Sequence, residues 1–275
     1  MNFVRYVILT TLIPVFYSAL TAPLLAHELW LEPEKYQVET GEPAKIHIRN
    51  GESFAGISLS YFTNRIRSFR WASQTETGDV ISRSGDVPAA TVVFEDVGLA
   101  SLVYESTPST LTYSKWEKFV NFVKHKDAVF AIEEHQARGL PKTGFKEVYY
   151  RFSKVLLSIG EASGMDKRQG LLTEFVALEN PYSATIGTHL PVALFHKDQP
   201  RINAQVEVFE RAPDGRVTVF TVRTNEVGVA KIPLNKGHEY LLDAVIVQKP
   251  VLDIENSKGA VWESLWAALT FEVPK

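Results

Sequence analysis

The sequence of 275 residues contains no cysteine. This absence excludes disulfide bonds, thiolate metal sites and a cysteine nucleophile. It also excludes a bacterial lipoprotein, whose lipid is carried on a cysteine after the signal. The chain lacks an excess of basic residues as well, because 29 Lys and Arg residues stand against 32 Asp and Glu residues. Since nucleic-acid-binding domains are usually basic, this charge balance excludes nucleic acid as a partner.

Familiar catalytic motifs are also missing. The chain has no Gly-x-Ser-x-Gly turn, no glycine-rich phosphate loop and no His-Glu-x-x-His helix. The carboxylate pairs Glu133-Glu134 and Asp253 with Glu255 show no sign of burial, so we predict that they lie on the solvated surface. A Ser-His-Asp triad assembled by folding stays open, but the sequence does not predict an enzyme.

What the chain does contain, at its N-terminus, is a long apolar run. This run extends from Val7 to Leu25, and Arg5 is the only charged residue among the first 26. Because the run ends at the small residue Ala26, it is typical of a signal peptide. We therefore expect residues 1–26 to be removed, so that a periplasmic chain begins at His27. The alternative is an uncleaved membrane anchor, because a bilayer is crossed by about 20 apolar residues.

Residues 27–110 have the pattern of short strands and turns. Ala44, Ile46 and Ile48 alternate with polar neighbours, which places one face of a strand in a core. Asn50-Gly51 predicts a tight turn directly after this strand, because both residues tolerate positive φ. Further strands are expected at 91–94 and 100–104. The segment is therefore predicted to be an N-terminal β-sandwich.

Residues 111–165 are predicted to form a helical insert. Ser114-Lys115-Trp116-Glu117 has the spacing of a capping box at a helix start. A second helix is expected from about Asp127 to Arg138, ended by Gly139. A third helix is expected at about 145–159, where one stripe at helical spacing contains Phe145, Val148, Phe152, Val155, Leu156 and Ile159.

Residues 166–275 return to the strand pattern. Apolar residues alternate with other residues in several runs, and turns such as Pro213-Asp214-Gly215 separate them. The clearest runs contain Leu190, Val192 and Leu194; Val206 and Val208; Tyr240, Leu242, Ala244 and Ile246; and Ala267, Leu269, Phe271 and Val273. The predicted fold class is thus mainly β, with two β-sandwich domains, Ig-like or carboxypeptidase-regulatory-like, joined by the helical insert.

Six segments together carry a resemblance to a known family. In chain order they are Ala26-His27-Glu28-Leu29-Trp30-Leu31-Glu32-Pro33, Asn50-Gly51-Glu52-Ser53-Phe54, Ala137-Arg138-Gly139, residues 146–154, Asn180-Pro181-Tyr182 and residues 262–271. In this order they resemble a family of exported bacterial proteins classified as domain of unknown function 4198. The resemblance implies a periplasmic protein related to components of nickel uptake. It also implies a His in the penultimate core strand where this chain has Ile246, so a metal site using that position lacks a ligand here.

His27 is the candidate metal ligand. If cleavage leaves it first, its α-amine and imidazole can chelate one Cu²⁺ or Ni²⁺ ion, because these metals favour nitrogen donors, and Co²⁺ is a further candidate. The alternative is that His27 merely begins a docked strand, with Trp30 packed in the core. The remaining histidines show no metal-ligand spacing and are predicted to be structural or solvated: His47, His125, His135, His189, His196 and His238.

Two tryptophans near the C-terminus, Trp262 and Trp266, raise the option of a sugar-binding cleft, but we predict that Trp266 lies at the edge of a core strand. The function predicted for the chain is that of a solute- or transition-metal-binding accessory of a nickel or cobalt uptake system. Its partner would be a transporter component of the inner or outer membrane. The alternative is a non-catalytic structural or interaction module of the cell envelope. A copper-dependent oxidase built on His27 would need a second His beside it.

Overall fold

The structure, a computed structural model, describes residues 27–161, 163–251 and 257–275. The predicted signal peptide lies outside the described residues, and so does the carboxylate pair Asp253 and Glu255. Within the described residues, every helix is too short or too polar to span a bilayer.

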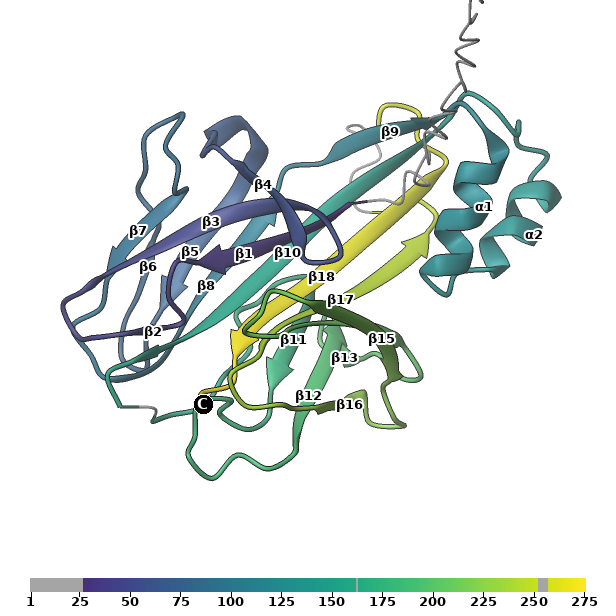
Figure 1. The fold of residues 1–275 in the computed structure, drawn as a ribbon. Helices are drawn as coiled ribbons and strands as arrows, with labels where there is room; N and C mark the ends of the chain where they lie inside the picture. Colours follow the sequence, from purple (N-terminus) through teal and green to yellow (C-terminus); the bar gives the residue numbers. More distant parts are fainter. Residues whose placement is uncertain (1–26, 162, 252–256) are drawn as a thin grey trace, which may run out of the picture.

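A sheet of ten strands forms the middle of the molecule (Figure 1). Its main path runs in the order β15-β14-β17-β18-β10-β8-β5-β6, and β2 and β9 pair with β10 beside that path. A second sheet, of β1, β3, β4 and β7, covers one half of the middle sheet, and a third, of β11, β12, β13 and β16, covers the other half. The prediction of a mainly β fold built from sandwich layers is confirmed.

The strands have the following bounds. The middle sheet contains β2 (Gln37–Val38), β5 (Ile66–Ala72), β6 (Thr77–Asp79), β8 (Gly98–Ser106), β9 (Ser109–Tyr113), β10 (Phe145–Ile159), β14 (Gln205–Arg211), β15 (Val217–Arg223), β17 (Glu239–Gln248) and β18 (Trp262–Glu272). The second sheet contains β1 (Glu28–Pro33), β3 (Pro43–Glu52), β4 (Ala55–Leu59) and β7 (Ala90–Val93). The third contains β11 (Thr173–Ala177), β12 (His189–His196), β13 (Gln199–Pro200) and β16 (Val229–Pro233).

The strand β10 is shared by both halves of the molecule. It pairs in parallel with β18, from Glu147 opposite Trp262 to Val155 opposite Thr270. The prediction of a helix at 145–159 is therefore wrong. Residues between the apolar positions, including Ser153 and Lys154, are fully buried too. A strand buried on both faces has no period of two, so its apolar residues matched a helical stripe by coincidence.

Two short helices lie together at one end of the middle sheet (Figure 1). They are α1 (Trp116–His125) and α2 (Phe130–Ala137), which confirms the first two predicted helices. Gly139 adopts a φ of +61° just after α2, as expected of the residue that ends a helix. The predicted capping box does not form, because Lys115 occupies the N-cap and no side chain caps α1.

The turn after β3 lies later than Asn50-Gly51 predicts. Both of these residues belong to β3, and the positive φ angles, +51° and +58°, fall on Ser53 and Phe54. Phe54 is held there by its ring, which is 1% exposed and packs edge-on against Trp30 at 5.6 Å. Burial of an aromatic side chain thus sets the position of this turn, and it overrides the local preference of Asn-Gly.

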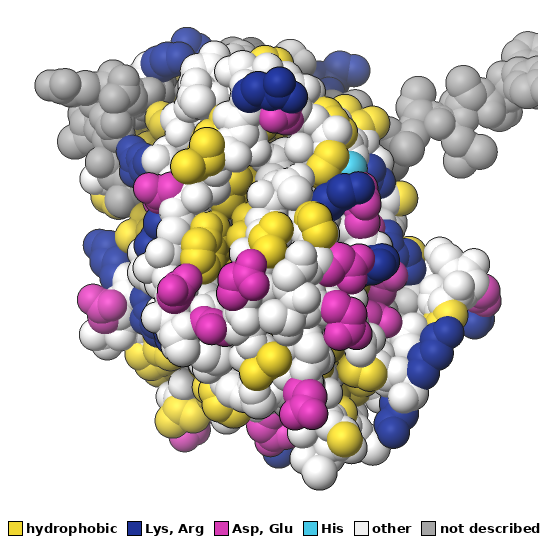
Figure 2. All heavy atoms as spheres, turned by 90° about the vertical axis from the view of Figure 1, so that its left-hand side faces the viewer, with side chains coloured by type: hydrophobic (Ala, Val, Ile, Leu, Met, Phe, Trp, Pro, Cys, Tyr) yellow, Lys and Arg dark blue, Asp and Glu magenta, His cyan; other side chains and the backbone are white. Residues whose placement is uncertain are grey.

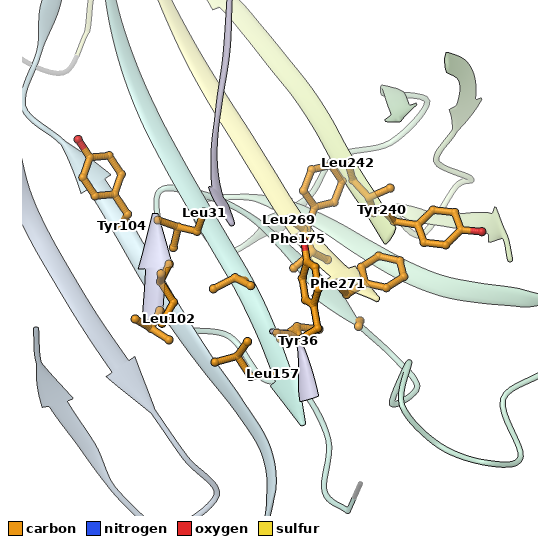
Figure 3. Close-up of a cluster of buried hydrophobic side chains, with 14 of the residues drawn as sticks. Leu31, Tyr36, Leu102, Tyr104, Leu157, Phe175, Tyr240, Leu242, Leu269 and Phe271 are labelled. Carbon is orange, nitrogen blue, oxygen red and sulfur yellow. The ribbon is translucent and has the colours of Figure 1, made fainter. Parts of the chain in front are cut away.

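One hydrophobic core continues through both halves of the molecule. Leu31 and Leu157 from one half and Leu269 and Phe271 from the other belong to the same buried cluster (Figure 3). The alternating residues predicted in β12, β14 and β18 are fully buried. On the outside, acidic and basic side chains are mixed over the face shown in Figure 2, and hydrophobic side chains lie between them.

Truncation of a core residue tests this packing. The variant Leu269→Ala removes a fully buried side chain, and we expect it to lower the free energy of unfolding by about 2–5 kcal/mol. The matched control is Ile57→Ala, because Ile57 is 67% exposed, and its effect should stay within about 0.5 kcal/mol. Urea titrations of both variants measure the difference, and equal effects would contradict the shared core.

Candidate functional site

A pocket of about 230 Å³ opens where β9, β10 and α1 meet the start of β1. The residues that line it come from five elements, β3, β9, α1, β10 and β18, and from the residue before β1. They are His27, Asn50, Thr110, Leu111, Thr112, Tyr113, Lys118, Phe122, Glu147, Tyr149, Arg151 and Trp266. Successive alternate residues of β10, Glu147, Tyr149 and Arg151, share one face of that strand and form one wall.

Arg151 is the buried cation of this wall, with 8% of its surface exposed. Its guanidinium lies 3.8 Å from the centre of the Trp266 ring and 5.2 Å from that of Tyr149. Nη2 donates a hydrogen bond to the carbonyl oxygen of His27 at 2.7 Å. Nη1 is buried and has no hydrogen-bond partner among the described residues. A buried guanidinium nitrogen without an acceptor is costly, so the wall has unused capacity for an acceptor.

Glu147 is the buried acid of the same wall. It accepts hydrogen bonds from the hydroxyl of Tyr113 at 2.5 Å and from the hydroxyl of Ser264. Ser264 in turn accepts a hydrogen bond from the indole nitrogen of Trp266 at 2.9 Å. Burial raises the pKa of Glu147, and the two hydroxyl donors oppose that rise. Glu147 therefore orients Tyr113 and, through Ser264, the indole on which Arg151 rests.

A second buried group of charges, which we call the Lys126 cluster, lies behind the pocket. Lys126, the residue that ends α1, donates hydrogen bonds to Glu28 at 3.2 Å, to Asp243 at 3.0 Å and to Glu207. The ligand atoms of the three carboxylates lie within 4.8 Å of one another, a spacing that suits a cation. The Lys126 ammonium is that cation. It anchors α1, and so the α1 wall of the pocket, to β1, β14 and β17.

The carboxylates of the Lys126 cluster differ in their ionisation. Burial raises the pKa of Glu28 to about 7, although the Lys126 ammonium opposes the rise. Burial also raises the pKa of Asp243, again against Lys126. Burial acts in the same direction on Glu207, but hydrogen bonds from His125 and Lys126 outweigh it and lower the pKa of Glu207. The cluster therefore exchanges a proton near neutral pH at Glu28.

His27, the predicted metal ligand, is exposed at the rim of the pocket. Its Nδ1 lies 3.3 Å from Oε1 of Glu52, which brings one carboxylate to the imidazole. Among the described residues, Glu28, Glu207 and Asp243 are close enough together to hold a metal ion. His27 does not belong to that group. His27 thus has one carboxylate neighbour and lines the pocket. Its role as a metal ligand stays a prediction.

The sequence model of a domain of unknown function, DUF4198, matches residues 24–248. The chain belongs to the DUF4198 family. No curated protein matches it. One solved structure, a tetra-tandem repeat in the extending region of a large adhesion protein, aligns at 8% identity and a TM-score of 0.19, over 90% of this chain and 50% of that one. This DUF4198 chain thus spans about half of that protein's chain, and a TM-score this low does not establish a shared fold.

The other histidines of this DUF4198 protein are spread over separate contacts. His125 binds Glu207, and His238 lies 2.8 Å from Glu210. His135 accepts a hydrogen bond from the indole of Trp262. This bond holds the Trp262 ring against α2. His196 lines an open hollow of about 360 Å³ together with Ile246, the position where the resemblance implies a histidine.

Trp266, predicted at the edge of a core strand, is 2% exposed and also lines the pocket. The residues that sequence reasoning missed are charged side chains inside apolar runs. Glu147 and Arg151 lie within the segment 145–159, where the predicted helix would turn both side chains toward solvent. Asp243 interrupts the apolar run 240–247. A charged residue inside an apolar run is the sequence signal for such a site, because a buried charge requires a buried partner.

The proton on Glu28 leads to a prediction for stability. Because the folded-state pKa of about 7 lies above the ordinary value of 4.5, this group stabilises the fold below pH 4.5, and the contribution is lost as pH rises through about 7. In Glu28→Gln, we expect the fall in unfolding free energy between pH 5 and pH 8 to shrink, by at most about 3 kcal/mol. Glu117→Gln, exposed on α1, is the control and should keep the wild-type slope. Parallel slopes for all three proteins would contradict the buried, protonated state of Glu28.

Proposed function

We propose that this DUF4198 protein is a periplasmic solute-binding accessory of a transport system, and that its pocket binds a small organic anion. The observation that carries the proposal is the Arg151 guanidinium, which is stacked on Trp266 in the pocket wall with Nη1 buried and without an acceptor. A planar guanidinium held by an aromatic ring is well suited to a carboxylate, because its donors match the two oxygens.

The rest of the pocket supports this class of ligand. Lys118 projects from α1 as a second, exposed cation, so two positive charges surround the space. Phe122 and Tyr149 add apolar surface for the body of the ligand. The volume of about 230 Å³ is smaller than that of a usual drug-sized pocket, about 300–1,000 Å³, so the ligand is a small solute. A membrane transporter component is the partner that such a carrier would serve.

Binding of defined anions tests the proposal. Benzoate and citrate are titrated against the protein while the fluorescence of its tryptophans is followed. We expect at least one of these anions to bind with a Kd below about 1 mM, because a charge-assisted pair in a desolvated wall adds about 1.5–3 kcal/mol to the apolar contacts of the ligand. Arg151→Met should weaken that binding by at least about tenfold, and Lys118→Met by about threefold.

Two controls keep this experiment interpretable. Arg83→Met removes a guanidinium whose side chain is 92% exposed, and it should bind like the wild type. Lys118→Met lies on the surface, so its effect does not depend on the tolerance of the core to a change at Arg151. If no anion binds, or if all variants bind alike, the solute-binding role is wrong and a structural module of the envelope becomes the better account.

A second candidate function, transition-metal binding, is favoured by the pair His27 and Glu52. In a chain that begins at His27, the α-amine and Nδ1 belong to one residue, and Oε1 of Glu52 lies 3.3 Å from Nδ1. Two nitrogens and one carboxylate oxygen form a donor set that suits Ni²⁺, Co²⁺ or Cu²⁺. Arg151 fixes the backbone of His27 by binding its carbonyl oxygen, which keeps the residue at the pocket rim.

Calorimetric titration of a chain beginning at His27 with Ni²⁺, Co²⁺ and Cu²⁺ tests this second candidate. We expect a Kd below about 100 μM for at least one metal. A chain whose His27 α-amine is acetylated loses the chelating amine but keeps the imidazole, and it should bind at least about tenfold more weakly. Glu52→Gln should weaken binding as well. Equal affinity of the acetylated chain would exclude the amine as a ligand.

A further inference from the structure

A third group of buried charges lies on the opposite face of β10, at Lys154. The side chains of Lys154, Asp166 and Glu174 are each no more than 1% exposed. Lys154 Nζ lies 3.2 Å from Oδ1 and 3.3 Å from Oδ2 of Asp166, and 2.7 Å from Oε1 of Glu174. Nζ also donates to the carbonyl oxygen of Lys167 at 3.2 Å. An amine, a carboxyl group and a second carboxylate thus share one dry site.

We propose that Lys154 and Asp166 condense to an intramolecular amide, an isopeptide cross-link, with Glu174 as the proton carrier. The Lys154 ammonium gives a proton to Glu174, and the neutral Nζ attacks Cγ of Asp166. The new N–Cγ bond forms and a Cγ–O bond breaks. The oxygen leaves as water, with the second proton that nitrogen gives up and the proton that Glu174 returns. Ammonium plus carboxylate gives amide plus one water, so no oxidant, reductant or other reactant is needed.

The surroundings of Asp166 favour attack at its carbon. The backbone amide of Lys167 donates to Oδ1 at 2.8 Å, and that of Ala177 donates to Oδ2 at 2.9 Å. Such fixed donors stabilise the negative oxygen that forms when an amine adds to a carboxyl group. Burial raises the pKa of Asp166, with Lys154 opposing, which favours the protonated acid needed for the loss of water. For the attack, the carboxyl group has to turn so that Nζ approaches its face.

The charge balance of the site favours the product. Burying an ammonium and a carboxylate is unfavourable because both ions lose their hydration, and condensation removes both charges. What remains is Glu174, which keeps its own partners: the Arg168 guanidinium at 3.2 Å and the backbone amides of Gln169, Gly170 and Leu171. A cavity of about 10 Å³ beside Asp166 has room for about one water, the leaving group.

The cross-link would join the strand shared by both halves to the segment that enters the third sheet. Lys154 lies in β10, Asp166 lies in the loop after it, and Glu174 lies in β11. The loop around Asp166 is already tied to the end of β11 through the amide of Ala177. An amide at this place would lock that junction covalently in a chain that has no disulfide.

Mass spectrometry of the folded full-length chain tests the cross-link, both as purified and after prolonged incubation at neutral pH. We expect an intact mass lower than that of the sequence by one water. After tryptic digestion, cleavage after Lys154 should be blocked, so that the peptide 152–167 appears intact and lighter by one water. Glu174→Gln should restore the full mass. In Asp166→Asn, the leaving group becomes ammonia, so the mass should fall by one ammonia.

Two outcomes overturn the proposal. One is a full-length mass and normal cleavage after Lys154 in a protein that unfolds cooperatively, which would leave Lys154 in a simple ion pair. The other is a water loss that maps to a link between Lys154 and the peptide containing Glu174. Lys154→Met, in which no link can form, gives the reference mass, and Asp96→Asn, which changes a carboxylate outside this group, should keep the water loss.

Discussion

The parallel pairing of β10 with β18 is the constraint on which the rest of the structure depends. It joins the two sandwich halves into one sheet, and both strands are buried almost throughout. β1 lies across this pair, since the amide of Leu31 donates to the hydroxyl of Ser153 in β10, and the hydroxyl of Thr270 in β18 donates to the carbonyl oxygen of Leu31. The start of the described chain is therefore fixed over the centre of the molecule.

Burial on both faces of β10 also explains where the charged groups gather. One face presents Glu147 and Arg151 to the pocket, and the opposite face presents Lys154 to Asp166 and Glu174. A charge on such a strand cannot reach water by rotating its side chain, so it persists only with a partner. The pocket wall and the Lys154 site meet this requirement on the two faces of β10, and the Lys126 cluster meets it where α1 joins β1, β14 and β17.

Much of the fold was predictable from sequence, because strands with one wet face show a period of two. Ala44, Ile46 and Ile48 in β3, and the alternating residues of β12 and β14, are the clearest cases. The strand β10 was not predictable in this way, since both of its faces are buried. The candidate site was hidden for the same reason, because Arg151 and Glu147 lie on that strand. The predicted export signal and the family resemblance point to His27, but no pattern in the sequence places it at a pocket rim.

The continuous core has a consequence for how a ligand can enter. Two-lobed binding proteins close like a clamshell, because a hinge separates lobes with independent interiors. Here the halves share one interior through Leu157 and Leu269, so a hinge would have to open the core itself. A ligand that enters the pocket would therefore reach it from the pocket's own rim, where β9 and α1 meet, without any separation of the two halves.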